Sequence, residues 1–383
     1  MHSISNNFKE LPLSGVFIAT GDLAPDRENY SESFAATQEV LQQADIVFGQ
    51  LETSFAREGV RAPQARHAVL AHPDGAKALA DAGFNCISMA GNHVLDWGND
   101  AFFETRHHLT ESGISVVGAG ANIREARQPA RFTLDDGTRV AILAYSSILP
   151  MAYWAEQRRP GCVPMRAHTI YEQIEHDQPG TPPRIHTFPH REDLAAMQQD
   201  IRKAKEENDV VIVSQHWGIH FVRAVIADYQ RDVATAAVAA GADAIIGGHP
   251  HILKGCEVID DAPVFYSLCN FATDLRMDAE HAASKGFNEI RGLAEEWEPD
   301  FDSLYNFPTA SRLSMAARLE IAQGRIQRSG FLPIFIGHDA VPHFLGSDDP
   351  RRGEVVDYMR AVTGEAGLNA RYHEGTDMVE LSV

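Results

Sequence analysis

Side chains able to bind metal ions follow successive strand-like runs along this chain, and this recurrence restricts the fold more than any other feature. From residue 15 to residue 271, short β-branched runs alternate with amphipathic stretches, the pattern of a layered α/β fold. In open α/β sheets, sites form in the crevice beyond the carboxyl ends of the strands. Five strand ends are therefore expected to deliver polar side chains to one edge. The candidates are Asp22, Glu52, Asn92 with His93, His216, and His249 with His251.

The same alternation predicts the individual elements. Strands are expected over residues 15–22, 45–52, 84–93, 114–120, 210–218, 243–251 and 263–271. Helices are expected over residues 31–44, with Ser31 as N-cap, and over residues 73–83, 99–113, 191–208 and 229–241. A hairpin over residues 131–147 should turn at Asp136 and Gly137, a strong turn pair.

The chain is expected to form one domain over residues 1–383, with three additions to the alternating pattern. Residues 149–190 are rich in Pro and His and are expected to form a lid or loop insertion, because structureless loops of this length in compact domains are usually functional. Residues 272–310 are expected to form a second irregular insertion. Residues 311–383 are expected to form a C-terminal extension of strands and a helix.

The charge, the N-terminal segment and the cysteines restrict partners and location. A formal net charge of −20 disfavours binding to nucleic acid and to anionic membranes. Residues 1–13 lack the basic and apolar regions of a signal peptide, and no stretch approaches the roughly 20 apolar residues that span a bilayer. Four separated cysteines indicate neither a disulfide framework nor a zinc ribbon. These features predict a cytoplasmic protein without nucleic-acid or membrane partners.

The candidate ligands favour particular metals. Carboxylate, amide and imidazole groups together suit zinc, manganese or iron better than calcium or magnesium. The absence of thiolates from the set argues against a structural zinc site. A carboxylate that bridges two ions about 4 Å apart can produce a metal-bound hydroxide near neutral pH. The sequence therefore predicts one or two divalent transition-metal ions.

Six short motifs in this sequence are also those of a known family. They are GD at 21–22, QLE at 50–52, GNHVLDWG at 91–98, HWG at 216–218, GGHPH at 247–251 and YSLCNF at 266–271. With them, the chain resembles the CapA-like, or poly-γ-glutamate capsule-synthesis, branch of the calcineurin-like metallophosphoesterases over most of residues 15–271. This resemblance implies a layered α/β/β/α sandwich with inserted loops.

The resemblance also implies two ligand sets that share Glu52 as a bridge. The first ion would be held by Asp22, Glu52 and His251, and the second by Glu52, Asn92, His216 and His249. His93 would be the general acid or base, and Asp96 would hold its tautomer.

Two departures from the family pattern affect these expectations. Leu23 and Ala24 follow Asp22 where ordinary members of the superfamily carry Asp-x-His, so the first ion loses an imidazole ligand. His220 stands where the branch commonly has an acidic residue, which indicates a different substrate pocket and a further catalytic imidazole. Aromatic residues near the motifs are candidates for binding substrate: Trp97, Trp154 and Trp217.

Three functions are compatible with these residues. The first is a metal-dependent hydrolase that uses metal-bound hydroxide and His93 on a phosphoester or on a peptide-like or γ-glutamyl amide. The second is a metal-assisted lyase or epimerase acting on a small, aromatic substrate, because one metal with His93 and His220 suffices for proton transfer. The third is a non-catalytic capsule component that binds polymer. The expected partner is a small-molecule or peptide-like substrate, and a homo-oligomer is compatible with each function.

Overall fold

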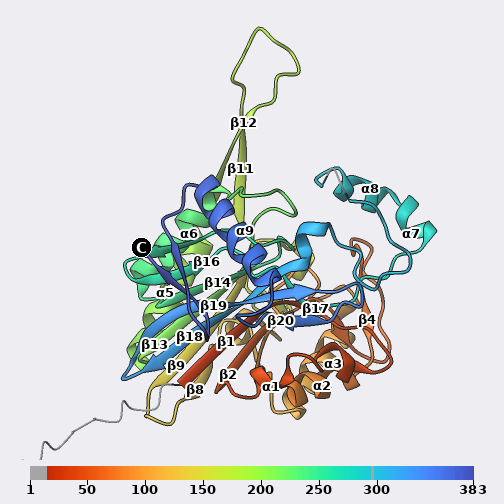
Figure 1. Cartoon of the computed structure of the whole chain (residues 1–383). Helices are drawn as coiled ribbons and strands as arrows, with labels where there is room; N and C mark the ends of the chain where they lie inside the picture. The colour runs from red at the N-terminus through yellow and green to blue at the C-terminus, as the bar shows by residue number, and fades with distance from the viewer. Residues whose placement is uncertain (1–14, 295–296) are drawn as a thin grey trace, which may run out of the picture.

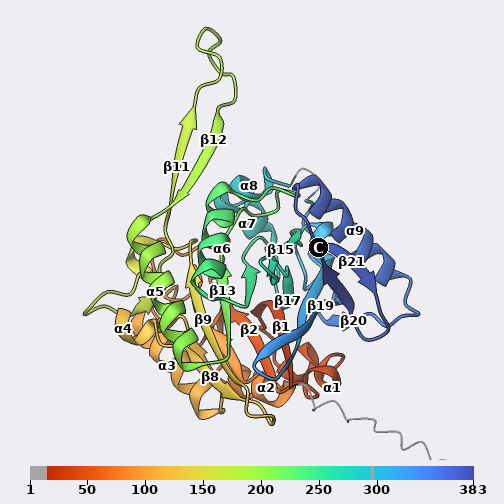
Figure 2. The ribbon, with the colours of Figure 1, turned by 90° about the vertical axis from the view of Figure 1, so that its left-hand side faces the viewer.

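The computed structural model describes residues 15–294 and 297–383. Residues 1–13, expected to lack a signal peptide, and residues 295–296 of the second insertion lie outside the described residues. Two β-sheets pack face to face, and helices cover the outer face of each (Figures 1 and 2). This arrangement confirms the layered α/β/β/α sandwich.

The first sheet contains ten strands. Along its main path the order is β21 (Arg371–Glu374), β22 (Val379–Ser382), β19 (Arg325–Ile336), β18 (Leu313–Ala322), β1 (Gly15–Ala24), β2 (Ile46–Leu51), β5 (Cys86–Ser88) and β6 (Ser115–Val117). Two more strands join it, β17 (Asn270–Thr273) beside β1 and β20 (Pro342–Phe344) beside β19. The strands β1, β2, β5 and β6 are parallel neighbours, as the predicted alternation requires.

The second sheet contains six strands. Their order is β15 (Cys256–Ile259), β16 (Ala262–Phe265), β14 (Ala244–Gly248), β13 (Val210–His216), β9 (Arg139–Ser146) and β8 (Ala130–Thr133). The antiparallel pair β8–β9 confirms the predicted hairpin, and Gly137 in its turn has a φ of 85°, a conformation that favours glycine. Two short two-stranded pairs lie outside these sheets: β3 (Ser54–Phe55) with β4 (Leu70–Ala71), and β7 (Ala119–Gly120) with β10 (Gly161–Cys162).

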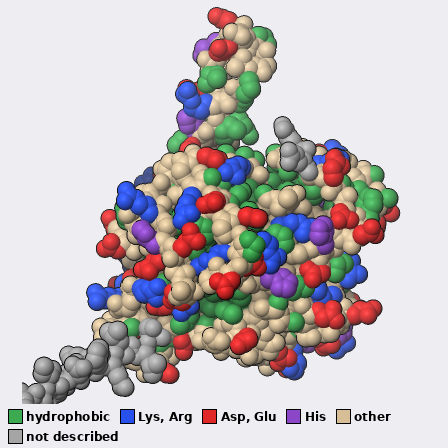
Figure 3. All heavy atoms as spheres, in the orientation of Figure 1, with side chains coloured by type: hydrophobic (Ala, Val, Ile, Leu, Met, Phe, Trp, Pro, Cys, Tyr) green, Lys and Arg blue, Asp and Glu red, His purple; other side chains and the backbone are tan. Residues whose placement is uncertain are grey.

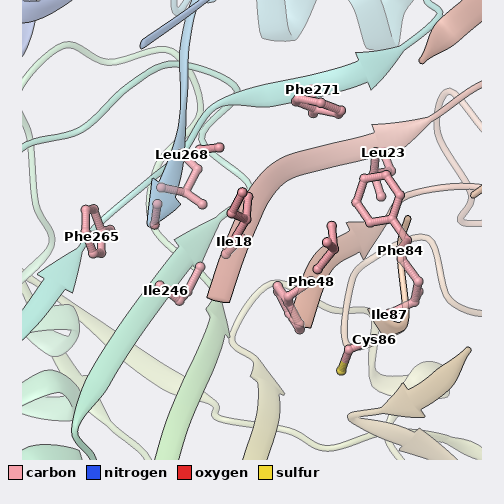
Figure 4. Packing of buried hydrophobic residues seen from close by; sticks show 14 of the residues in the cluster. Ile18, Leu23, Phe48, Phe84, Cys86, Ile87, Ile246, Phe265, Leu268 and Phe271 are labelled. Atoms are coloured by element: carbon pink, nitrogen blue, oxygen red, sulfur yellow. The ribbon is translucent and has the colours of Figure 1, made fainter. Parts of the chain in front are cut away.

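Alternating side chains of the second sheet enter two different cores. In β13, Val210 and Ile212 pack in the core between the sheets, whereas Val211 and Val213 pack in the core beneath α5 (Arg191–Glu207) and α6 (Asp228–Ala240). Figure 4 shows the core between the sheets, where side chains of β1 and β2 approach those of β14 and β16. A strand buried on both faces explains the continuous apolar run in the sequence.

The remaining helices differ in part from the prediction. They are α1 (Gln38–Leu41), α2 (Asp74–Ala82), α3 (Gly98–Glu111), α4 (Ile123–Ala126), α7 (Ala279–Ala283), α8 (Lys285–Arg291) and α9 (Arg351–Glu365). The helix predicted over residues 31–44 is wrong, because that segment forms the 3-10 helix η1 (Tyr30–Ser33) and the single turn α1. Asn29, not Ser31, caps η1, and the Thr37 hydroxyl donates to the carbonyl of Phe34 between the two pieces.

The first insertion contains a projecting hairpin. After the 3-10 helix η2 (Met151–Tyr153), the strands β11 (Ala167–Glu172) and β12 (Arg184–Pro189) pair with each other in a two-stranded ribbon that extends beyond the body (Figures 1 and 3). Several apolar side chains on it are exposed, among them Ile170, Tyr171 and Ile185. Alternation over only six residues on either side of a Pro-rich stretch gave little strand signal in the sequence.

The second insertion contains two short helices, and the C-terminal extension consists mainly of strands and a helix. Helices α7 and α8 lie beyond β17 and β4 (Figure 1), and a third small core of apolar side chains anchors them. The extension adds β18 and β19 as predicted, packs α9 against both strands and against β15, and ends in the hairpin β21–β22. Among the described residues, no helix combines the length and apolar character that crossing a bilayer requires. All four cysteines are buried thiols.

Candidate metal centre

Carboxyl ends of strands from both sheets meet at one seam. Asp22 lies near the end of β1, Glu52 directly follows β2, and His216 is the last residue of β13. One ligand atom from each of these three buried residues lies within 4.8 Å of the others. The strand ends therefore converge as the sequence predicts, and they do so between the two sheets.

Asp22 is fixed on one side and unpartnered on the other. Its Oδ2 accepts the backbone N–H of His249 at 3.1 Å and lies 3.4 Å from Nδ1 of His251. Its Oδ1 is buried and has no hydrogen-bond partner among the described residues. Burial, followed by the charge of Glu52, raises the pKa of Asp22 well above its usual range.

The two carboxylate oxygens of Glu52 face different imidazoles, His216 on one side and His93 on the other. Its Oε1 accepts the side-chain amide of Gln50 at 3.2 Å and lies 3.6 Å from Nε2 of His216. Its Oε2 lies 3.8 Å from Nε2 of His93 and has no hydrogen bond within the described part of the chain. Burial is the main cause that raises the pKa of Glu52 to about 7, although the nearby His93 opposes the shift.

Asn92, His216 and His249 complete the inner part of the cluster. Nε2 of His216 lies 2.7 Å from Oδ1 of Asn92, and the rings of His216 and His249 meet edge to face with centroids 4.8 Å apart. Burial lowers the pKa of both imidazoles well below the usual range, so both rings are neutral and can offer a lone pair.

The buried donor set could bind a metal ion. Four buried atoms, all candidate ligands, have no hydrogen-bond partner among the described residues: Asp22 Oδ1, Glu52 Oε2, His216 Nδ1 and His249 Nδ1. Such atoms are costly in a folded protein unless something binds them, and a cation satisfies carboxylates and neutral imidazoles together.

His251 is oriented by a chain of hydrogen bonds that the sequence did not reveal. Its Nδ1 lies 2.7 Å from Oδ1 of Asn270, whose amide donates to the hydroxyl of Tyr305 at 2.8 Å. The Tyr305 hydroxyl donates in turn to the carbonyl of Ser311 at 2.6 Å. Nδ1 of His251 therefore donates to Asn270 and leaves Nε2 free to bind a metal. Asn270 lies in the YSLCNF motif, which could have indicated its role.

His93 and Asp96 form an acid–base pair at the edge of the cluster. Nδ1 of His93 lies 2.6 Å from Oδ2 of Asp96, and the hydroxyl of Tyr153 donates to Oδ1 of Asp96 at 2.7 Å. Burial alone would lower the pKa of His93, but the hydrogen bond to Asp96 and the charges of Glu52 and Asp96 outweigh it and raise the pKa. The structure thus brings together the pair that the family resemblance implies.

The ring of His220 packs against two candidate ligands, His249 and His251. Its ring lies 3.9 Å from the ring of His249 and stacks on the ring of His251 at 5.3 Å. Burial, followed by the charge of His251, lowers the pKa of His220 well below its usual range. A neutral imidazole therefore lies beside the cluster, in a position to contact a bound substrate.

A cavity of about 430 Å³ opens over His93, His220 and His251. None of the three tryptophans predicted to bind substrate is among the described residues that line it. Trp217 is fully buried in the core beneath α6 and donates to the carbonyl of Tyr266, because it follows His216 by one residue and faces the opposite side. Trp154 lies under the guanidinium of Arg166, and Trp97 packs beside Gly59.

A small substitution beside the cluster is expected to weaken metal binding although it removes no ligand. A Cβ at Gly248 would lie 2.7 Å from Oδ1 of Asp22, so Gly248→Ala must displace that carboxylate. We expect the affinity for zinc or manganese, measured by calorimetric titration, to fall about 10- to 100-fold. Gly353→Ala in α9, whose Cβ meets nothing within 4 Å, is the control. Equal affinities of the two variants would contradict this prediction.

Acidification is expected to loosen the second insertion. His67 stacks on His281 of α7 with ring centroids 4.6 Å apart. Burial, followed by nearby groups that are or become cationic, lowers the pKa of His67 from 6.5 to about 4; these groups are His281, His93, Arg61 and Arg66. The stability that neutral His67 contributes is therefore present above pH 6.5 and lost as the pH falls towards about 4. Thermal unfolding of His67→Gln should depend less on pH over this range than that of the parent protein, and an unchanged dependence would contradict the prediction.

Comparisons with known proteins agree with the motifs. Residues 16–275 match the family described as bacterial capsule synthesis protein PGA_cap. The PGA biosynthesis protein CapA of Bacillus subtilis is 26% identical over 63% of this chain and 56% of its own length. The capsule biosynthesis protein CapA of Bacillus anthracis is 28% identical over 61% of this chain and 52% of its own length.

A third relative, protein y4sH of Sinorhizobium fredii, is 30% identical over 67% of this chain and 66% of its own length. The chain therefore spans between about half and two thirds of the length of these relatives. The family match covers all the strand ends of the candidate metal centre, from Asp22 to His251. This chain belongs to the PGA_cap family of bacterial capsule synthesis proteins.

Proposed function

We propose that this protein is a metal-dependent hydrolase that cleaves a phosphoester or an amide bond, with a small or peptide-like substrate. The observation that supports this proposal is the position of His93. Its Nε2 lies 3.8 Å from Oε2 of Glu52, which has no hydrogen-bond partner in the described part of the chain. A general acid or base thus borders a cluster of buried ligands under an open cavity. When bound, one or two divalent ions would supply Lewis acidity and lower the pKa of a water molecule.

The chain's own residues account for the proton transfers. Asp96 accepts a hydrogen bond from Nδ1–H of His93, so in the neutral imidazole Nε2 carries a lone pair and can take a proton from water. The raised pKa of His93 lets the same nitrogen return that proton to the leaving group. Tyr153 holds the second oxygen of Asp96 and thereby fixes the orientation of the pair.

The test begins with metal content and continues with turnover. Protein purified without a histidine tag is analysed for zinc, manganese and iron. The loaded protein is then incubated with p-nitrophenyl phosphate, its diester, and the p-nitroanilides of phenylalanine and γ-linked glutamate. We expect turnover of at least one phosphoester or amide, lost with a chelator and restored by metal. Stoichiometric metal without any turnover would overturn the proposal.

A metal-assisted epimerase or lyase is the second candidate, favoured by His220. This imidazole lines the same cavity as His93, so two proton-transfer groups border one substrate site. An epimerase must exchange a substrate proton with solvent, whereas a hydrolase need not. Deuterium entering recovered substrate in heavy water, without cleavage, would favour this candidate. A released carbonyl fragment would identify a lyase.

A non-catalytic role in polymer binding is the third candidate, suggested by the names of the relatives. Two Mycobacterium tuberculosis relatives, each 28% identical over 65% of this chain and 60% of their own length, bear the name probable polyglutamine synthesis accessory protein. Binding of poly-γ-glutamate that survives metal removal, together with no turnover, would support this role.

A further inference from the structure

The cavity over the candidate metal centre is lined by residues of two main kinds. The polar residues of the centre, here called the floor, are Glu52, Asn92, His93, His220 and His251. The large apolar residues, here called the wall, come mostly from the second insertion: Phe221, Met277, Phe287, Ile290, Leu293, Trp297 and Phe307. A molecule bound there must therefore offer a polar group to the floor and an apolar group to the wall.

The aromatic side chains of the wall pack against one another, and one of them contacts the candidate ligand His251. The ring of Trp297 lies 5.0 Å from the rings of Phe221 and Phe287, and all three side chains are largely buried. Phe307 lies 5.2 Å from the ring of His251. Because the aromatic rings support one another and touch His251, an apolar group against the wall would lie next to the metal centre.

The wall also retains accessible apolar surface. Leu293 lines the cavity and is 47% exposed, unlike the buried rings behind it. An exposed leucine by itself means little, but this one continues a concave apolar surface beside a cluster of candidate ligands.

The charges around the cavity do not suit a polyanion. Among the described residues that line it, Arg66 is the only arginine or lysine, and its guanidinium lies 3.8 Å from the carboxylate of Glu289. Asp274, also in the lining, is paired with Arg27. A polymer with one carboxylate on every residue would need a row of cationic partners, which this lining does not provide.

We propose that the second insertion forms a specificity pocket for a neutral apolar side chain of aromatic size, adjacent to the bond on which the metal centre acts. This inference rests on the proposed function, since it assigns the substrate class of the same site. The substrate would be a peptide-like molecule with such a side chain. The insertion would then distinguish this chain's substrate from a polyglutamate.

The test compares the binding of two amino acid derivatives, both with blocked and therefore uncharged termini, to the metal-loaded protein. N-acetyl-phenylalanine amide presents an aromatic side chain, and N-acetyl-glutamate amide presents a carboxylate. Titration calorimetry should give a Kd about tenfold or more lower for the aromatic probe. Comparable affinity, tighter binding of the glutamate probe, or no saturable binding of the aromatic probe would overturn the inference.

Matched variants locate the effect. Leu293→Asp places a charge on the wall at a half-exposed position that can tolerate it, and should weaken the aromatic probe about tenfold. Phe301→Asp makes the same change at a 58% exposed residue of the same insertion outside the lining, and should leave the affinity unchanged. Circular dichroism and metal content confirm that both variants are folded. Equal effects of the two variants would overturn the inference.

The outcomes separate the pocket from the reaction. Selective binding of the aromatic probe without turnover of any substrate would leave the pocket intact and remove the proposed hydrolase. Turnover that prefers the γ-glutamyl anilide over the phenylalanine anilide would support the hydrolase and overturn the pocket.

Discussion

Replacing His216 and His249 together by alanine is expected to abolish metal retention. Both imidazoles are buried, both are kept neutral by burial, and Nδ1 of each has no partner among the described residues. Without them, His251 is the one candidate histidine ligand left beside the carboxylates and Asn92 in the described residues. Elemental analysis should show the metal content falling to background, and turnover should fall with it.

The same variant should lose the stabilisation that metal confers. At a free metal concentration about 100 times the Kd, binding to the folded state adds about 2.7 kcal/mol to the free energy of unfolding. Thermal unfolding with and without metal should therefore show a shift in the parent protein and none in the variant. Alanine at the exposed residues His107 and His343 is the matched control. Retention of stoichiometric metal by the His216 and His249 variant would mean that the metal lies elsewhere.

His93→Gln is expected to lower kcat while leaving the metal content unchanged. His93 is the acid–base group in the proposed mechanism, and the loss of such a group typically costs about 10²- to 10⁴-fold in rate. A glutamine cannot exchange a proton near neutral pH, although its size is similar. Metal content and kcat, measured on the same preparation, separate this effect from damage to the ligands.

Asp96→Asn tests the link between His93 and its orienting partner. The asparagine keeps the shape but can face Nδ1 of His93 with its amide nitrogen, which favours the wrong tautomer. We expect a large fall in kcat and an acid limb of the pH–rate profile displaced to lower pH, because Asp96 helps to raise the pKa of His93. His107→Gln, at an exposed site, should behave like the parent protein.

The outcome for the His93→Gln variant decides the role of His93 itself. If kcat of His93→Gln is unchanged, His93 takes no part in the mechanism.

The sequence was most informative where a strand ends. Asp22 and His216 each follow a long apolar run, and such runs fix both the strand and the edge at which it stops. The same periodicity could have excluded Trp217, since consecutive residues of a strand point to opposite faces.

Residues that act through other residues were harder to find from the sequence. Tyr153 reaches Asp96 from an insertion, and Tyr305 reaches Asn270 from another. Neither lies at a fixed spacing from its partner, so no sequence pattern joins them. The wall of the cavity was missed for a similar reason: Phe287 and Trp297 lie in a segment without helical or strand periodicity long enough to place their side chains.

The separation of the ligands along the chain has a consequence for folding. The contact between Asp22 and the backbone of His249 joins residues 227 positions apart, and the strand that holds Asp22 changes neighbours there, from β18 near its start to β17 near its end. Contacts between such distant residues close large loops and form late. Asp22 therefore cannot meet His249 until the chain has been made through β14, so uptake of a metal ion at this centre would follow, and not precede, the pairing of β13 with β14.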